Sequence, residues 1–249
     1  MSDLASWVIV PIGLTFFLAG MVKGVTGMGL PTVAMGLLGA FMAPVPAAAL
    51  LIVPSFVTNV WQLLSGPSFT ALVSRLWLMM LGIMLGTIAS SSVLASNNTR
   101  WTTAGLGAAL AIYASFTLLA RQLSVPARLE KWLSPLIGLT TGAVTGGTGV
   151  FVIPAVPYLQ ALGLSKDDLI QALGLSFTVL TIALAVGLTW RGAFQLDSLV
   201  LSSLAIVPAM AGMWCGQAIR QKVSPTTFRR WFLICLLLLG IELTLRSFL

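Results

Sequence analysis

Few polar side chains lie inside the apolar segments of this chain, and those few are the candidates for binding a ligand. Lys23 is a basic residue in such a segment, between Gly20 and Gly24. An ionisable group within a membrane segment is a functional candidate, whereas a lysine near the end of a span can extend its ammonium group to the interface. Both interpretations are open for Lys23, and only the first would bring positive charge to a ligand.

Two glycine-rich segments could form a ligand site from backbone groups. Gly24, Gly27 and Gly29 do not share one helical face, so helix packing through small residues does not account for them. They predict a break in the backbone, which a membrane tolerates only where protein or a water-filled cavity satisfies the polar groups. The second segment has the same character: Gly142, Gly146, Gly147 and Gly149, followed by Pro154 as Pro31 follows the first.

The two breaks together suit an anion. Paired breaks in two halves of a transporter are the usual sign of its binding site, and helix N-termini that meet near the midplane would direct partial positive charge at one spot. Thr26, Thr145 and Thr148 lie beside the glycines, and we expect their hydroxyl groups to contribute. The alternative is a pair of kinked helices that pack closely for stability.

A polar stripe supports the same interpretation. Ser55, Asn59 and Gln62 are spaced at i, i+4 and i+7 on one helical face. The counterpart segment carries Ser176 and Thr178. Neutral amides and hydroxyls could replace the hydration shell of an oxyanion without binding it too tightly to release it. The alternative is ordinary hydrogen bonding between helices.

The composition excludes most other classes of function. Of the 249 residues, 58% are hydrophobic and 8% are charged, far fewer charges than the roughly 25% of soluble domains. There is no histidine and there are only six carboxylates, so a histidine-based triad and a typical metal site lack their parts. An enzyme using Lys23 or a serine as nucleophile would lack a G-x-S-x-G elbow and a base. We expect no enzyme, no cofactor and no metal.

The elements that must position these residues are membrane helices. About ten apolar segments fill residues 1–249 and leave no room for a soluble domain. The net charge of +7 comes from single basic residues at segment ends, which indicates membrane topology and not nucleic-acid binding. The predicted fold is an all-α polytopic membrane protein in one domain, with the lipid bilayer as its partner.

The chain also repeats itself, with halves at residues 1–124 and 125–249. Gly27 and Gly29 match Gly147 and Gly149, and Ser55 matches Ser176. Four identities share an offset of 130 residues: Gly82, Gly86, Arg100 and Trp101 match Gly212, Gly216, Arg230 and Trp231. The two GxxxG pairs among them indicate close helix packing, which could also lie at the subunit interface of a homodimer.

The basic residues decide the orientation of the halves. If each glycine-rich segment enters and returns, nine basic residues lie on one side of the membrane and three on the other, with Lys23 inside. The positive-inside rule favours this uneven division over the even one that eight simple crossings would give. We therefore expect inverted repeats of about five membrane segments each, with re-entrant or broken helices meeting at a central site and both termini outside the cytoplasm.

These motifs resemble those of the sulfite exporter TauE/SafE family. The similar stretches are G-x3-G-V-T-G-M-G-L-P and G-L-T-T-G-A-V-T-G-G-T-G followed by P-x2-P-Y-L-Q-A-L-G-L-S-K-D, and the likeness extends over essentially the whole chain. The resemblance implies a multi-pass, bacterial-type inner-membrane permease for small anions, typically sulfur oxyanions or organosulfonates such as sulfite or sulfoacetate. By that resemblance, Gly27, Gly29, Thr145, Gly147, Thr148 and Gly149 would line the central site.

The resulting hypothesis is a secondary transporter of a small anion that works by alternating access. The expected substrate-binding residues are Lys23, Thr26, Gly27, Gly29, Asn59, Gln62, Thr145, Gly147, Thr148, Gly149, Ser176 and Thr178. An anion-conducting channel is the alternative, and a cation carrier is disfavoured by the shortage of carboxylates inside the membrane segments.

Overall fold

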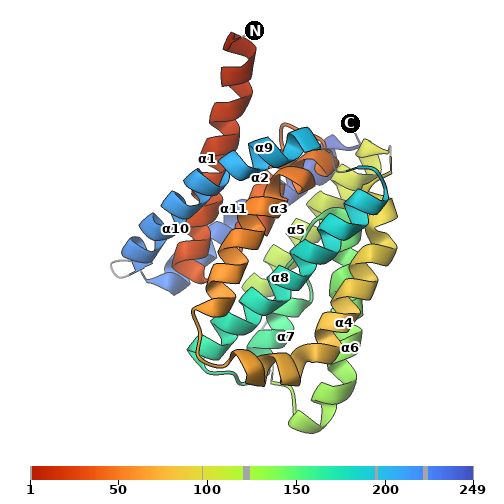
Figure 1. Cartoon of the computed structure of the whole chain (residues 1–249), viewed down its shortest axis with the longest axis vertical. Helices are drawn as coiled ribbons and strands as arrows, with labels where there is room; N and C mark the ends of the chain where they lie inside the picture. Colours follow the sequence, from red (N-terminus) through yellow and green to blue (C-terminus); the bar gives the residue numbers. More distant parts are fainter. Residues whose placement is uncertain (1, 97, 120–123, 194–195, 221–223, 249) are drawn as a thin grey trace.

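The computed structural model describes residues 2–96, 98–119, 124–193, 196–220 and 224–248. In this part of the chain every regular element is an α-helix (Figure 1). The helices are α1 (Ser2–Thr26), α2 (Leu30–Gly39), α3 (Pro44–Leu64), α4 (Phe69–Leu94), α5 (Thr99–Leu119), α6 (Ala127–Thr148), α7 (Ala155–Ala161), α8 (Lys166–Trp190), α9 (Leu196–Leu204), α10 (Ile206–Arg220) and α11 (Pro225–Arg246).

Most of these helices have the length and composition of membrane spans. Within the described residues, six stretches are long and apolar enough to cross a bilayer: Ile9–Thr26, Pro44–Leu64, Phe69–Leu94, Thr99–Leu119, Lys166–Trp190 and Leu199–Arg220. Large apolar side chains also cover the outside of the bundle, Trp132 and Trp190 among the most exposed of them. An outer surface of this kind suits lipid and not water.

Helices that lie far apart in the sequence pack against each other. α1 packs on α10, α6 on α4, α3 on α8 and α5 on α11. In Figure 1, α3 and α5 run towards the lower part of the molecule, whereas α8 and α11 run away from it. The interior is therefore built by helices from both halves of the sequence.

Glycines allow the closest of these helix pairs. A Cβ atom added at Gly24 of α1 would lie 2.2 Å from the carbonyl oxygen of Met213 in α10, and one added at Gly86 of α4 would lie 2.3 Å from that of Leu139 in α6. The GxxxG pairs predicted for close packing do pack closely. They pack inside the chain, and these contacts account for the glycines without a subunit interface.

A proline in α3 is compensated by the other half of the chain. Pro54 has no N–H group, so the carbonyl of Leu50 loses its partner within the helix. The Ser202 hydroxyl of α9 donates to that carbonyl at 2.7 Å and accepts from the N–H of Val53 at 3.2 Å. This contact fixes α3 one turn before the polar residues Thr58 and Asn59.

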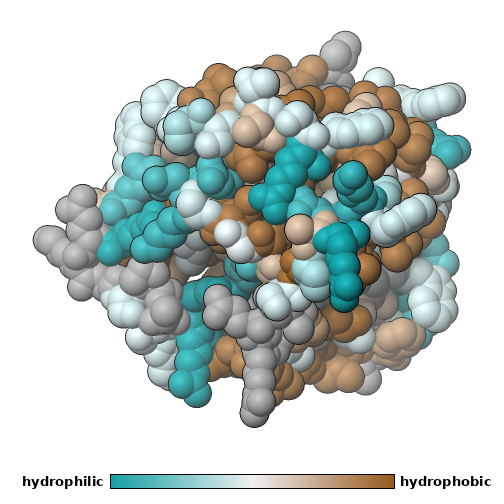
Figure 2. All heavy atoms as spheres, turned by 90° about the horizontal axis from the view of Figure 1, so that it is seen from below, coloured by the Kyte–Doolittle hydropathy of each residue, from teal (hydrophilic) through white to brown (hydrophobic). Residues whose placement is uncertain are grey.

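Basic residues concentrate at one end of the bundle. The end where α4, α6, α8 and α11 begin, here called the basic end, carries Arg75, Arg128, Lys131, Lys166, Arg220, Arg229 and Arg230, and the opposite end carries Arg100, Arg191 and Arg246. Arg121 and Lys222 lie outside the described residues. Figure 2, seen from below, shows hydrophilic side chains gathered over this part of the molecule.

Candidate functional site

The first glycine-rich segment interrupts the helix. α1 ends at Thr26 and α2 begins at Leu30. Gly27 and Gly29 have φ angles of +77° and +103°, a conformation that side chains with a Cβ rarely adopt. The Thr26 hydroxyl donates to the carbonyl of Val22 at 2.8 Å and accepts from the N–H of Met28 at 3.3 Å. The hydroxyl thus links the last turn of α1 to the backbone of the break.

The second glycine-rich segment is interrupted in the same way, by a glycine of positive φ that follows a threonine. α6 ends at Thr148, and Gly149 follows with a φ angle of +74°. The Thr148 hydroxyl donates to the carbonyl of Val144 at 2.7 Å and accepts from the N–H of Val150 at 3.2 Å. Thr26-Gly27 and Thr148-Gly149 therefore correspond. Gly147, which the sequence match pairs with Gly27, lies within α6.

The spacing between the closely packed glycine and the backbone break differs between the two halves. Gly20 packs against the carbonyl of Ala209, and Gly138 packs in the same way against that of Met79. Seven residues separate Gly20 from Gly27, but eleven separate Gly138 from Gly149. The second copy thus has about one extra helical turn, some 6 Å, between its crossing and its break.

Lys23 lies inside the protein, not at its surface. Its side chain is 3% exposed, and its Nζ donates to Thr58 Oγ1 at 3.2 Å and to Asn59 Oδ1. The interpretation in which the ammonium group extends to the interface is therefore wrong. The side chains of the carboxylates Glu130, Asp167, Asp168 and Glu242 are described, and none of them forms an ion pair with Lys23.

Two polar groups on α3, one on Asn59 and one on Ser55 a turn earlier, lack partners among the described residues. Asn59 Nδ2 and Ser55 Oγ are buried and form no hydrogen bond with any described residue. Both can donate, and a buried donor without a partner costs about 1–3 kcal/mol. Lys23, Ser55, Thr58 and Asn59, here called the Lys23 cluster, thus combine one buried positive charge with free donors. Such a set favours an acceptor that carries negative charge.

Gln62 holds the first break against the other half of the chain. Its Nε2 donates to the carbonyl of Gly27 at 2.8 Å and to that of Ile170 in α8 at 2.7 Å. Both N–H groups of the amide are therefore used by the backbone. Gln62 positions the break, although the sequence pattern indicates a ligand contact.

The hydroxyl residues predicted for the second half hydrogen-bond within their own segments. The hydroxyls of Thr145, Ser176 and Thr178 donate to backbone carbonyls within their own segments at 2.9, 2.9 and 2.7 Å. On α5, Tyr113 contacts Met28 of the first break, and Gly105 faces Thr148 of the second. These two contacts are eight residues apart, about 12 Å along the helix.

Sequence reasoning missed Thr58. Its hydroxyl accepts from Lys23 and donates to the carbonyl of Pro54 at 2.8 Å. Thr58 adjoins Asn59 and lies three residues after Ser55, so it belongs to the same helical face. The spacing could have identified it.

Comparison with known proteins agrees with this architecture. The family model for the sulfite exporter TauE/SafE matches residues 12–243 of the 249. The chain belongs to the TauE/SafE family. No curated protein and no solved structure shows significant similarity to it. The TauE/SafE family is one of membrane permeases and not of enzymes, and the apolar helices agree that this is a multi-pass membrane protein.

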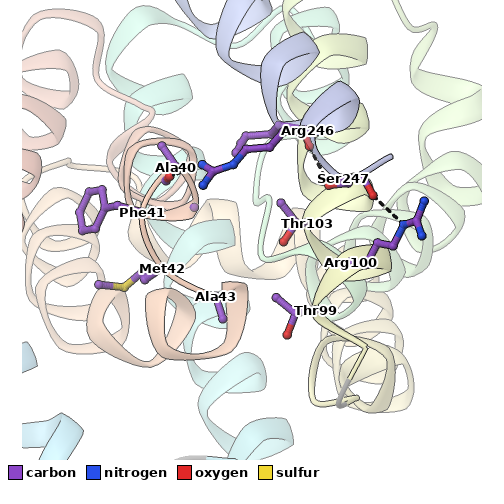
Figure 3. Close-up of a pocket in the computed structure, with 11 residues that line it drawn as sticks. Ala40, Phe41, Met42, Ala43, Thr99, Arg100, Thr103, Arg246 and Ser247 are labelled. Atoms are coloured by element: carbon purple, nitrogen blue, oxygen red, sulfur yellow. Dashed lines mark hydrogen bonds between the residues drawn. The ribbon is translucent and has the colours of Figure 1, made fainter. Parts of the chain in front are cut away.

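The TauE/SafE chain also has a cavity of about 380 Å³ at the end opposite the basic end. Arg100 and Arg246 line it (Figure 3), and their guanidinium groups lie on different sides of the opening. Arg246 donates to the carbonyl of Ala40 at 2.8 Å, and Arg100 donates to that of Ser247 at 2.6 Å. Each carbonyl belongs to the C-terminal cap of a helix. These arginines therefore stabilise helix ends.

Proposed function

We propose that the chain is a secondary transporter of small sulfur oxyanions or organosulfonates, such as sulfite or sulfoacetate, in a bacterial-type inner membrane. The family supplies the class of protein. The substrate, the site and the mechanism are inferred from the residues inside the bundle.

The Lys23 cluster carries this proposal. An isolated charge removed from water is unfavourable by several kcal/mol, yet Lys23 is buried and its partners among the described residues, Thr58 and Asn59, are neutral. A bound anion would offset that cost and would also accept hydrogen bonds from Ser55 Oγ and Asn59 Nδ2, which lack partners. Intramembrane ionisable residues commonly mark the path of a substrate.

The helix arrangement supports alternating access between two inverted halves. Gly212 and Gly216 pack on Phe17 and Met21 of α1, as Gly82 and Gly86 pack on Pro135 and Leu139 of α6. The first helix of each half thus packs on the fourth segment of the other half. Corresponding helices such as α3 and α8 run in opposite directions (Figure 1). Transporters built this way rock one unit against the other around a fixed site.

A flux assay tests the proposed function. Purified protein would be reconstituted into vesicles, and uptake of labelled sulfite, sulfoacetate and sulfate would be compared with uptake by empty vesicles. We expect protein-dependent, saturable uptake of sulfite or sulfoacetate. Background flux for all three anions would contradict the proposal.

The same vesicles separate a carrier from a channel. A carrier that alternates between two states exchanges substrates, so unlabelled substrate inside should accelerate the entry of labelled substrate. Large unitary currents with weak saturation, and no acceleration by internal substrate, would instead identify an anion channel.

A further inference from the structure

The polar groups of the Lys23 cluster come from the first half of the chain alone. At the offset that pairs Ser55 with Ser176, the counterparts of Thr58, Asn59 and Gln62 are Val179, Leu180 and Ala183. These counterparts on α8 cannot hydrogen-bond through their side chains. The second half therefore repeats the scaffold of α3 without polar side chains at the positions of Thr58 and Asn59, and the buried polar residues of α8 lie at other positions.

The positive charge also comes from the first half, on Lys23. Lys23 corresponds to Thr141 when the helix crossings are aligned and to Thr145 when the breaks are aligned. Neither residue is charged, and both hydroxyls donate to backbone carbonyls, Thr141 at 2.6 Å and Thr145 at 2.9 Å. The second half thus places no equivalent cation at the corresponding point.

The free hydrogen-bonding capacity of the cluster suits one oxyanion group. An ammonium group has three N–H donors, and Lys23 uses two of them on Thr58 and Asn59. The N–H groups of Asn59 Nδ2 and the hydroxyl of Ser55 are unpartnered. All of these atoms can donate to an acceptor of negative charge.

We infer that the Lys23 cluster is a one-sided site, formed by residues of the first half of the chain, and that it selects an anionic group with a single negative charge. This inference rests on the proposed function in taking the bound anion as the transported substrate. One negative charge cancels the charge of Lys23, whereas two leave one negative charge uncompensated among buried apolar residues. Among the substrates proposed above, this narrows the choice to hydrogensulfite and simple monosulfonates. Sulfite dianion and sulfoacetate, which carry two charges like sulfate, should bind more weakly.

Methanesulfonate and sulfate make a matched pair for testing this selectivity, because they share the size and shape of the oxyanion and differ in charge. Binding to purified protein would be measured as the increase in unfolding temperature with ligand concentration. Competition against uptake of labelled methanesulfonate in vesicles would be measured in parallel. We expect methanesulfonate to bind at least about tenfold more tightly than sulfate, a difference of about 1.4 kcal/mol.

Two variants connect the selectivity to the cluster. Lys23→Met removes the charge and retains the length of the side chain, and it should abolish the preference for methanesulfonate. Asn59→Asp keeps the shape and places a carboxylate against Lys23, so it should weaken methanesulfonate binding at least about tenfold while raising the unfolding temperature without ligand. Lys166→Met changes an exposed lysine and should leave the preference unchanged. If Lys23→Met does not fold, Asn59→Asp carries the test.

The outcomes distinguish this inference from the proposed function. Equal or tighter binding of sulfate, or a preference that survives both Lys23→Met and Asn59→Asp, overturns the inference even if anions are transported. Binding of methanesulfonate that depends on Lys23, without any flux, supports the inference and contradicts the transport function. An absence of binding by either anion overturns the inference.

Discussion

Lys23 differs from other basic residues of the chain in having its ammonium group inside the bundle, hydrogen-bonded to Thr58 and Asn59. Lys166, by contrast, is exposed at the start of α8 on the basic end. Burial makes the charge of Lys23 energetically unfavourable, whereas water stabilises the charge of Lys166. This contrast provides a direct test at the scale of one residue.

Lys23→Ala should reduce the uptake of sulfite or methanesulfonate by at least about tenfold, because truncating one partner of a buried charge pair costs about 2–5 kcal/mol. Lys166→Ala should change uptake by less than about twofold, as a screened surface charge contributes little. Initial rates in vesicles, corrected for the amount of folded protein, give the comparison. Equal small effects of the two substitutions would remove Lys23 from the site.

The sequence predicts part of this cluster for a physical reason. Lys23 and Asn59 are polar residues in apolar helices, and such residues must find partners inside the protein. Whether a hydroxyl binds a ligand or returns to its own helix depends on geometry that composition does not contain. Thr145 and Thr148 illustrate this, because both hydroxyls close the second break by bonding to backbone carbonyls.

At the scale of helices, glycine performs two distinct tasks in the same short segment. Gly27 and Gly29 adopt positive φ angles, while Gly20 and Gly24 of the preceding helix let α10 approach closely. The sequence predicts that the backbone is unusual near residue 27. It does not separate the two tasks, because the residue type alone does not show whether a glycine is required for its φ angle or for its small size.

Gly24→Ala and Gly13→Ala test the packing role of glycine on a single helix. The added Cβ at Gly24 would lie 2.2 Å from a backbone oxygen of α10, whereas one at Gly13 meets nothing within 4 Å. Gly24→Ala should therefore destabilise the protein by about 1–3 kcal/mol. Gly13→Ala should be neutral or stabilising by up to about 1 kcal/mol, since alanine favours the helix. Thermal unfolding in detergent measures both, and a stable Gly24→Ala protein would contradict the close α1–α10 contact.

For the whole molecule, the uneven charge of the two ends determines how the bundle lies in the membrane. The basic end should face the cytoplasm, because basic residues concentrate on cytoplasmic loops. The sequence predicts this division from the positions of the basic residues. It does not predict that α1 pairs with α10 and α6 with α4, because packing between distant helices depends on their shapes together.

Cysteines at the two ends of α8 test this orientation. Lys166→Cys and Arg191→Cys would be made separately in a background in which Cys215 and Cys235 are replaced by serine. A membrane-impermeant thiol reagent applied to intact cells should label position 191 and spare position 166. In inside-out vesicles the labelling should reverse. Labelling of both positions from the same side would contradict the proposed crossing of α8.

The extra turn between crossing and break in the second half bears on the relative free energies of the two transport conformers. Because Gly149 lies about one turn farther beyond its crossing than Gly27 does, exchanging the roles of the two halves in the proposed carrier does not reproduce the starting state by a two-fold rotation. In the proposed carrier, the inward-open and outward-open conformers should then differ in free energy even without a gradient. Such a carrier rests mainly in one of them, and its affinity for solute, measured from the two faces of the membrane, is unequal.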